Sequence, residues 1–173
     1  MPILRHSGFP RILAIDPGTL HLGFAVLEQE RLIRAGVETV RPRRSPHETL
    51  QSGRAIIHRL IRDYRPRVLA LEKTFFANNR NSSLLNVFAD EIRSIGQRKK
   101  LRVLSFAPGT VKKAVTGDGR AGKEQVARVV VSRYPELRVY LTADRKWKVR
   151  YHQNMFDAIA VGLTAQQKQS PGP

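Results

Sequence analysis

A four-residue apolar run, Ile-Leu-Ala-Ile at positions 12–15, ends in Asp16 and is followed at once by Pro17 and Gly18. A run this short and apolar at every position is typical of a buried central strand. Pro17 cannot donate to a sheet ladder and Gly18 favours a sharp turn, so the strand is predicted to end at Asp16. A carboxylate held there needs a partner. Two interpretations stay open at this point: a hard divalent cation bound through oxygen, or an aspartate that caps the turn.

The same arrangement recurs at residues 68–71, Val-Leu-Ala-Leu, which end in Glu72. The helix predicted between the two runs is long enough for a crossover, so the two strands can lie parallel and side by side. Asp16 and Glu72 would then lie at the same edge of the sheet. Open α/β sheets bind their ligands at this edge, where the parallel strands end. Glu28 also follows an apolar run, but it precedes a charged turn and is assigned to solvent.

Other segments complete an α/β pattern of three antiparallel strands followed by parallel strands and helices. The predicted elements are strands at 11–16, 22–27, 32–40, 68–72 and 101–106, helices at about 46–64, 84–95, 125–134 and 153–167, and a short helix from Pro108; residues 137–141 are a short strand or an ordered loop. Ser45, Pro46 and Glu48 form a capping box at the start of the first helix.

Asp157 is a third unusual acid, because it lies in a helix that is otherwise apolar nearly all round. A salt bridge to a basic residue would explain it alone. Together with Asp16 and Glu72, however, it fits an octahedral Mg²⁺ or Mn²⁺ site, in which a shared carboxylate bridges two ions roughly 3.5–4 Å apart.

The overall charge indicates a polyanionic partner. The 173 residues include 31 Lys and Arg against 14 Asp and Glu, a net charge of +17, spread among apolar segments rather than gathered in the long tails typical of ribosomal proteins. With no cysteine, disulfides and zinc–thiolate sites are excluded. No run approaches the roughly 20 apolar residues of a membrane span, and the N-terminus lacks the apolar core of a signal peptide, so a soluble cytoplasmic protein is expected.

Five motifs in this order resemble RuvC-type Holliday-junction resolvases (crossover junction endodeoxyribonucleases): IDPGT around Asp16, LEKTFFANN around Glu72, VKKAVTG with Lys112, GKEQV with Lys123, and DAIA from Asp157. The resemblance runs from about residue 11 to 165. It implies an α/β ribonuclease-H-like fold with a five-stranded mixed sheet, and a homodimer that resolves four-way DNA junctions. Paired symmetrical nicks would leave 5′-phosphate and 3′-hydroxyl ends, and branch-migration machinery is a possible partner.

The resemblance assigns Asp16, Glu72 and Asp157 to metal binding and catalysis, with Mg²⁺ or Mn²⁺ as cofactor, two ions per site. The family's fourth ligand, Asp or His, is replaced here by Asn154. The amide oxygen of Asn154 can still bind a hard metal and lies on the same helical face as Asp157, but it adds no charge. His152 is an alternative ligand or base.

For DNA binding, the resemblance implies that Phe75 stacks on bases and that Lys112 and Lys123 approach phosphates, Lys123 also acting in catalysis. Arg120, in the glycine-rich turn before Lys123, is a further candidate. This turn resembles a nucleotide-binding P-loop, but it follows a helix and has Glu124 where Ser or Thr would hold Mg²⁺, so no nucleotide cofactor is expected.

We expect one ribonuclease-H-like nuclease domain over residues 11–167, after a flexible lead-in at 1–10 and before a disordered tail at 168–173. Dimer contacts are expected from the apolar faces of the helices at 50–64 and 84–95. Two alternatives remain: a ribonuclease-H-like nuclease that processes ribosomal RNA precursors, and a branched-DNA-binding module without catalysis.

Overall fold

The computed structural model describes residues 9–40, 45–73, 80–141 and 146–169, with only the backbone at 80–82 and 146–150. The elements follow in the order β1 (Ile12–Asp16), β2 (His21–Glu28), β3 (Arg31–Thr39), α1 (Pro46–Tyr64), β4 (Val68–Glu72), α2 (Arg80–Arg98), β5 (Arg102–Phe106), α3 (Pro108–Thr116), α4 (Lys123–Arg133), a 3₁₀ turn (Pro135–Leu137), α5 (Arg138–Leu141) and α6 (Lys146–Gln169). No helix in these ranges is both long and apolar enough to cross a membrane.

The strands form one mixed sheet in the order β3-β2-β1-β4-β5. β1, β2 and β3 pair antiparallel, and β4 and β5 add to β1 as parallel strands. This confirms the expected five-stranded mixed sheet and the crossover through α1. The predicted cap of α1 is also confirmed, because the Glu48 N–H donates to Ser45 Oγ at 3.2 Å.

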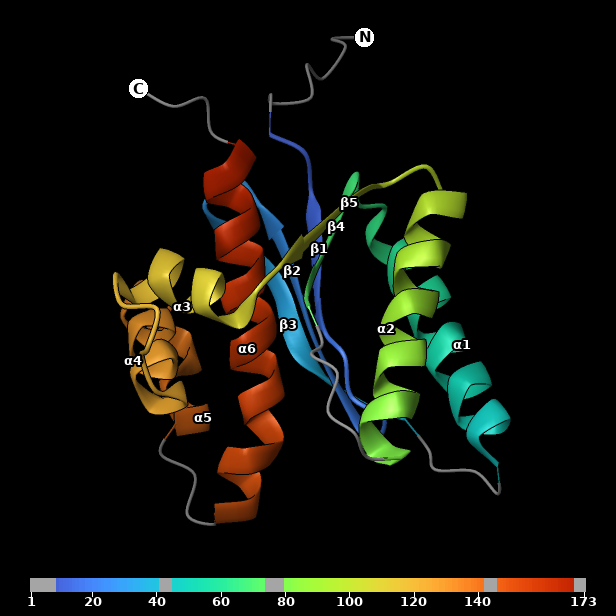
Figure 1. The fold of residues 1–173 in the computed structure, drawn as a ribbon. Coiled ribbons are helices and arrows are strands. Elements are labelled where there is room, and N and C mark those ends of the chain that lie inside the picture. The colour runs from blue at the N-terminus through green and yellow to red at the C-terminus, as the bar shows by residue number, and fades with distance from the viewer. Residues whose placement is uncertain (1–8, 41–44, 74–79, 142–145, 170–173) are drawn as a thin grey trace, which may run out of the picture.

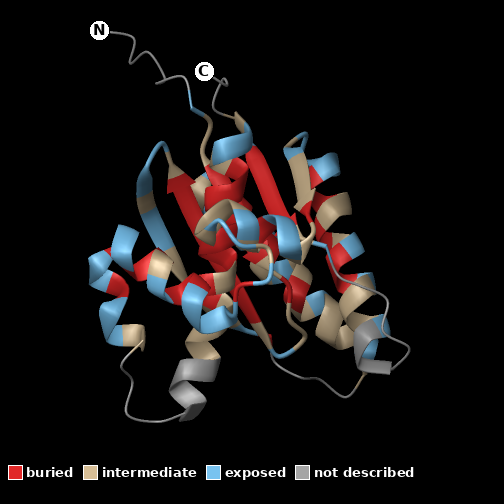
Figure 2. Ribbon diagram, turned by 60° about the vertical axis from the view of Figure 1, so that its left-hand side comes forward, coloured by how far each residue is buried: buried red, intermediate tan, exposed pale blue. Residues whose placement is uncertain are grey.

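Helices cover both faces of the sheet (Figure 1). On one face, Leu13 and Ile15 pack with α1 and α2. On the other, Ile12 and Ala14 pack with α6, beside which lie α3 and α4. The buried residues accordingly concentrate in the central strands and α6 (Figure 2). Because side chains alternate along a strand, Asp16 points to the same face of the sheet as Ile12 and Ala14, which is the face covered by α6.

α6 lies unusually close to the sheet, because the contact positions lack bulky side chains. A Cβ on Gly23 of β2 would lie 1.9 Å from the backbone oxygen of Asn154. Further along α6, a Cβ on Gly162 would lie 2.2 Å from Leu27 Cδ1. These two glycines fix the height and rotation of α6 over β1 and β2, and therefore the position of every α6 side chain.

The C-terminal third differs most from the sequence-based expectation. α6 begins at Lys146 and not near residue 153, and it ends at Gln169, two residues beyond the predicted end. The charged residues of its first turns hide the helical period. Residues 137–141, expected as a strand or loop, are helical, since Leu137 ends the 3₁₀ turn and Arg138–Leu141 forms α5.

Candidate active site

Asp16 and Glu72 end two neighbouring parallel strands. Ile15 pairs with Leu71, so the two acids occupy the next matched positions, on strands about 4.8 Å apart. Val68 and Ala70 pack on the α6 side of the sheet, and by alternation Glu72 faces that side too. The predicted meeting of these two acids at one sheet edge is therefore confirmed.

Asp157 is brought to the same edge by α6. Asp16 pairs with Gly23 across β1 and β2, and Gly23 is the position on which the backbone of Asn154 rests. Asp157 follows Asn154 by one helical turn, so it lies over the ends of β1 and β4. The predicted burial of this helix against the sheet is confirmed by its neighbours Phe156 and Ala158, which are 2% and 0% exposed.

The three acids influence one another electrostatically. Burial raises the pKa of Asp16 well above its usual range, and the charges of Asp157 and Glu72 raise it further. Burial likewise raises the pKa of Glu72 to about 7, helped by the charge of Asp157 and opposed by Lys123 and Lys112. Three carboxylates and two lysines from five separate elements thus form one site.

Both carboxylate oxygens of Asp157 are held. Lys123 Nζ, at the start of α4, lies 3.2 Å from Oδ2, and Gln153 Nε2, one turn earlier on α6, donates to Oδ1 at 2.9 Å. Burial alone would lower the pKa of Lys123, but the charge and hydrogen bond of Asp157, with Asp16 and Glu72, raise it. Gln153 was missed from the sequence, although its position four residues before Asp157 was a usable signal.

The donor chemistry fits a hard divalent cation, because the site offers carboxylate oxygens with excess negative charge. In this structure the positive charge beside Asp157 is the ammonium of Lys123. Among the residues that the structure describes, no three His, Asp or Glu side chains are gathered closely enough to hold a metal ion as they stand. A bound cation would therefore have to draw these carboxylates together and displace Lys123.

Asn154 and His152 have different surroundings. Asn154 Nδ2 donates to the His21 carbonyl oxygen at 3.2 Å, which ties α6 to the start of β2. The His152 ring packs against the rings of Tyr140 and Tyr151, with centroids 4.6 and 5.2 Å apart. His152 therefore packs beside α5, and Gln153 holds the carboxylate of Asp157.

The remaining candidates lie apart from the acids or outside the described residues. Arg120 is exposed in the turn before α4, where its N–H donates to Asp118 Oδ1 at 2.8 Å. Phe75 falls outside the described residues. Glu28 ends β2 at the opposite edge and pairs with Arg11 at 3.1 Å, with 37% of its side chain exposed. Antiparallel pairing thus excludes Glu28 from the site.

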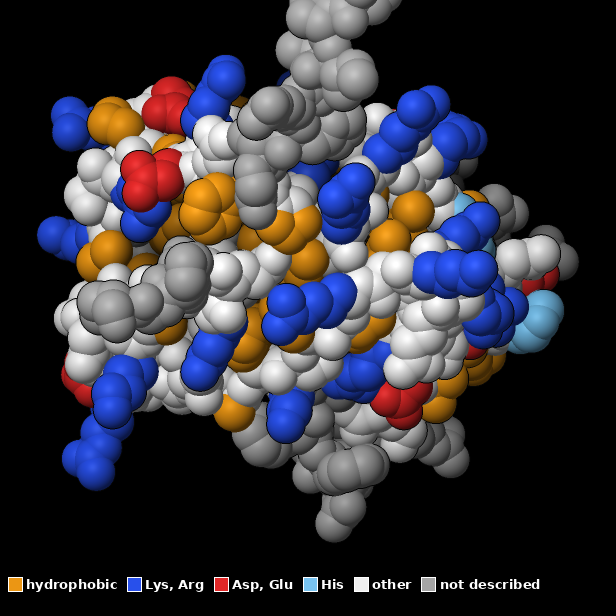
Figure 3. All heavy atoms as spheres, turned by 90° about the horizontal axis from the view of Figure 1, so that it is seen from above, with side chains coloured by type: hydrophobic (Ala, Val, Ile, Leu, Met, Phe, Trp, Pro, Cys, Tyr) orange, Lys and Arg blue, Asp and Glu red, His pale blue; other side chains and the backbone are white. Residues whose placement is uncertain are grey.

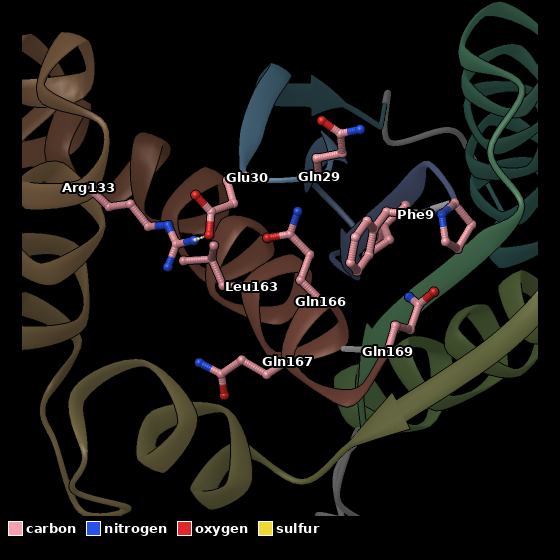
Figure 4. A pocket seen from close by; sticks show the side chains of 10 residues that line it. Phe9, Gln29, Glu30, Arg133, Leu163, Gln166, Gln167 and Gln169 are labelled. Atoms are coloured by element: carbon pink, nitrogen blue, oxygen red, sulfur yellow. Dashed lines mark ion pairs between the residues drawn. The ribbon is translucent and has the colours of Figure 1, made fainter. Parts of the chain in front are cut away.

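A cavity of about 600 Å³ lies at that opposite edge, near the start of β1 and the end of α6 (Figure 4). Its lining includes Phe9, Glu30, Arg133 and glutamines of α6. None of the three acids lines it, so this cavity is separate from the candidate active site.

Comparisons with known proteins point to one family. The family described as "Crossover junction endodeoxyribonuclease RuvC" matches residues 12–165. A curated RuvC of Rickettsia prowazekii is 35% identical over 124 residues, 69% of this chain and 79% of that protein. A RuvC of Rickettsia bellii is 30% identical over 158 residues, 88% of this chain and 94% of that protein.

Solved structures give the same result for the fold. The Thermus thermophilus RuvC structure matches with a TM-score of 0.73 and 25% identity, covering 92% of this chain and 95% of that one. A structure of the same protein in complex with a Holliday junction substrate matches with a TM-score of 0.71 and 23% identity over the same shares. The sheet, its order and these likenesses confirm the ribonuclease-H-like fold. The chain belongs to the crossover junction endodeoxyribonuclease RuvC family.

Proposed function

We propose that this chain is a metal-dependent endonuclease that resolves four-way DNA junctions by paired symmetrical nicks. The observation that carries the proposal is the electrostatic coupling of Asp16, Glu72 and Asp157 in one half-buried acidic site. The family assignment supports DNA as the substrate, and the T. thermophilus complex with a Holliday junction supports the four-way junction.

Asp16, Glu72 and Asp157 would hold Mg²⁺ or Mn²⁺, two ions per site, with the amide of Asn154 as a neutral fourth donor. The ions would supply Lewis-acid stabilisation of the charge that develops on the phosphate. Water adds to the phosphorus and the bond to the 3′ oxygen breaks, which leaves 5′-phosphate and 3′-hydroxyl ends.

The lysines of the site have complementary tasks in this proposal. Lys123, which pairs with Asp157 here, would place its ammonium beside the scissile phosphate when a metal is bound. Lys112 is close enough to Glu72 to lower its pKa and contacts a neighbouring phosphate. Phe75 and Arg120 are proposed to contact the opened junction. A net charge of +17 supports tight binding of the DNA backbone.

Paired nicks require two active sites, so we propose that the chain acts as a homodimer, and that branch-migration machinery delivers the junction. The apolar faces suggested as dimer contacts are occupied within the monomer, because Ile57 and Leu60 of α1 and Phe88 and Ile92 of α2 pack in one core. Val87 of α2 is 51% exposed, which supports a contact with a partner subunit on that side of α2.

The test is nicking of a labelled four-way junction with Mg²⁺ or Mn²⁺. We expect symmetrical paired nicks, lost in Asp16→Asn while junction binding stays, because phosphate contacts come from the basic surface. Glu28→Gln, an acid at the opposite edge, is the matched control and should nick normally. Cleavage of RNA but not of junctions would favour ribosomal RNA processing, and binding without any nick would indicate a non-catalytic module.

A further inference from the structure

The edge of the sheet opposite the three acids is strongly basic. There α1 and α2 end and β4 and β5 begin, and each helix-to-strand turn is rich in cations. We call five exposed residues of these turns the rear basic edge: Arg65, Arg67, Lys99, Lys100 and Arg102. Figure 3 looks onto the end of the molecule where the chain termini lie and shows many Lys and Arg side chains but few acidic ones.

Backbone pairing brings the two turns together. The Arg102 N–H donates to the Arg67 carbonyl oxygen at 3.0 Å, and the Arg67 N–H donates to the Arg11 carbonyl oxygen at 2.9 Å. Basic residues that are far apart in the chain therefore lie at the starts of neighbouring strands, and these strands are about 4.8 Å apart. The fold, rather than one basic stretch of sequence, creates this edge.

Three acids near this edge already have partners. Glu28 pairs with Arg11 at 3.1 Å, and Asp63 pairs with Arg62 at 2.9 Å. Glu91, further along α2, pairs with Arg98 at 3.2 Å. Within the described part of the chain, no residue of the rear basic edge forms an ion pair. The positive charge there is thus uncompensated and suits a polyanion.

Two of the five cations occupy backbone positions that favour glycine. Arg65, directly after α1, has φ of 47°, and Lys100, in the turn after α2, has φ of 58°. Glycine is the usual residue at such a position because it lacks a Cβ. Attraction to the helix C-termini explains cations at 65, 99 and 100. It does not explain Arg67 and Arg102, which belong to the starts of strands.

We propose that the rear basic edge is a second DNA-binding surface. It binds the phosphate backbone of one duplex, while a different duplex lies at the acidic edge, which is the sheet edge with Asp16, Glu72 and Asp157. The strands separate the two edges, so the same phosphates cannot lie at both. The ligand is double-helical DNA bound without regard to sequence, since these side chains offer charge to phosphates. This inference goes beyond the proposed nuclease activity, because binding of a duplex at this edge does not depend on cleavage.

The test is capture of a second duplex by the full chain in EDTA. Protein is bound at low surface density to an immobilised four-way junction, unbound protein is washed away, and a labelled linear duplex is added. The key variant is Arg65→Gly with Lys100→Gly, which removes two charges while supplying the residue that the backbone favours. The control, Arg34→Gln with Arg128→Gln, removes two exposed charges from the middle of β3 and α4.

We expect wild type and control to capture the duplex and the glycine variant to lose most of the capture, with an unchanged melting temperature. The slope of log affinity against log salt for linear duplex should become shallower by about 0.9 for each phosphate that the variant no longer neutralises. No capture by wild type, equal capture by the glycine variant, or equal loss in the control would overturn the proposal. Because the assay contains no metal, failure to nick junctions would bear on the nuclease alone.

Discussion

Lys123 Nζ lies 3.2 Å from Asp157 Oδ2, although the two residues are 34 positions apart and belong to different helices. The lysine neutralises part of a site that otherwise contains three like charges, and it opposes the rise in the pKa of Asp16 and Glu72. A metal ion bound to Asp157 would therefore compete with Lys123 for the same carboxylate.

Lys123→Met should slow junction nicking by about 10²–10³-fold, because it removes the ammonium that we propose stabilises charge on the phosphate. Junction affinity should change little, since the rest of the basic surface still holds the DNA backbone. Single-turnover nicking and gel-shift binding measure the two effects. Lys113→Met, an exposed lysine of α3, is the control; a nicking rate within about twofold of wild type for Lys123→Met would contradict the role assigned to Lys123.

The metal-free protein should lose stability as the pH rises from about 4.5 to 7. Folding raises the pKa of Glu72 to about 7, so in this range the folded state binds more protons than the unfolded state and stability falls. Solvent screening of the partly exposed Glu72 limits the effect to a fall of a few °C in Tm. Calorimetry in EDTA should show this fall in wild type and a smaller one in Glu72→Gln. Equal pH profiles would refute the raised pKa of Glu72.

Asn154→Asp should destabilise the metal-free protein by about 1–3 kcal/mol, because the donor to the His21 carbonyl oxygen becomes an acceptor. It also adds a fourth negative charge beside Asp157, so Mg²⁺ should raise the Tm of this variant more than that of wild type. Asn154→Ala removes the same hydrogen bond without added charge and should show no such extra response to Mg²⁺.

Gln153→Leu should weaken the apparent metal affinity by about 10–100-fold, because it removes the side chain that orients Asp157 Oδ1. Titration of nicking against Mg²⁺ should shift to higher concentration, while the rate at saturating metal stays near that of wild type. Gln51→Leu, at an exposed site on α1, is the matched control. An unchanged titration would show that Gln153 does not position Asp157.

Gly23→Ala should lower stability by about 1–3 kcal/mol, because its Cβ would meet the Asn154 backbone oxygen at 1.9 Å and push α6 off the sheet. Thermal unfolding should show a fall in Tm of about 2–4 °C for each kcal/mol. Gly109→Ala, whose Cβ would meet nothing nearer than 3.7 Å, should leave Tm unchanged or slightly higher. A normal Tm for Gly23→Ala would mean that α6 is less firmly seated than we infer.

Much of the fold and site could be predicted from local pattern. The short apolar runs that end in Asp16 and Glu72 predicted two parallel strands meeting at one edge, and the apolar helix around Asp157 predicted burial against the sheet. Each of these features depends on residues close together in the chain. Local pattern failed at the start of α6, where charged residues in the first turns hide the helical period.

Which side chains meet was decided only by the tertiary structure. Antiparallel pairing sends Glu28 to the far edge, and strand register assembles the rear basic edge. The rotation of α6 set at Gly23 brings Asp157 over the ends of β1 and β4, while His152 packs against Tyr140 of α5. The physical reason is that periodicity and turn residues determine individual strands and helices. The rotation and register between them depend on close packing of residues far apart in the sequence.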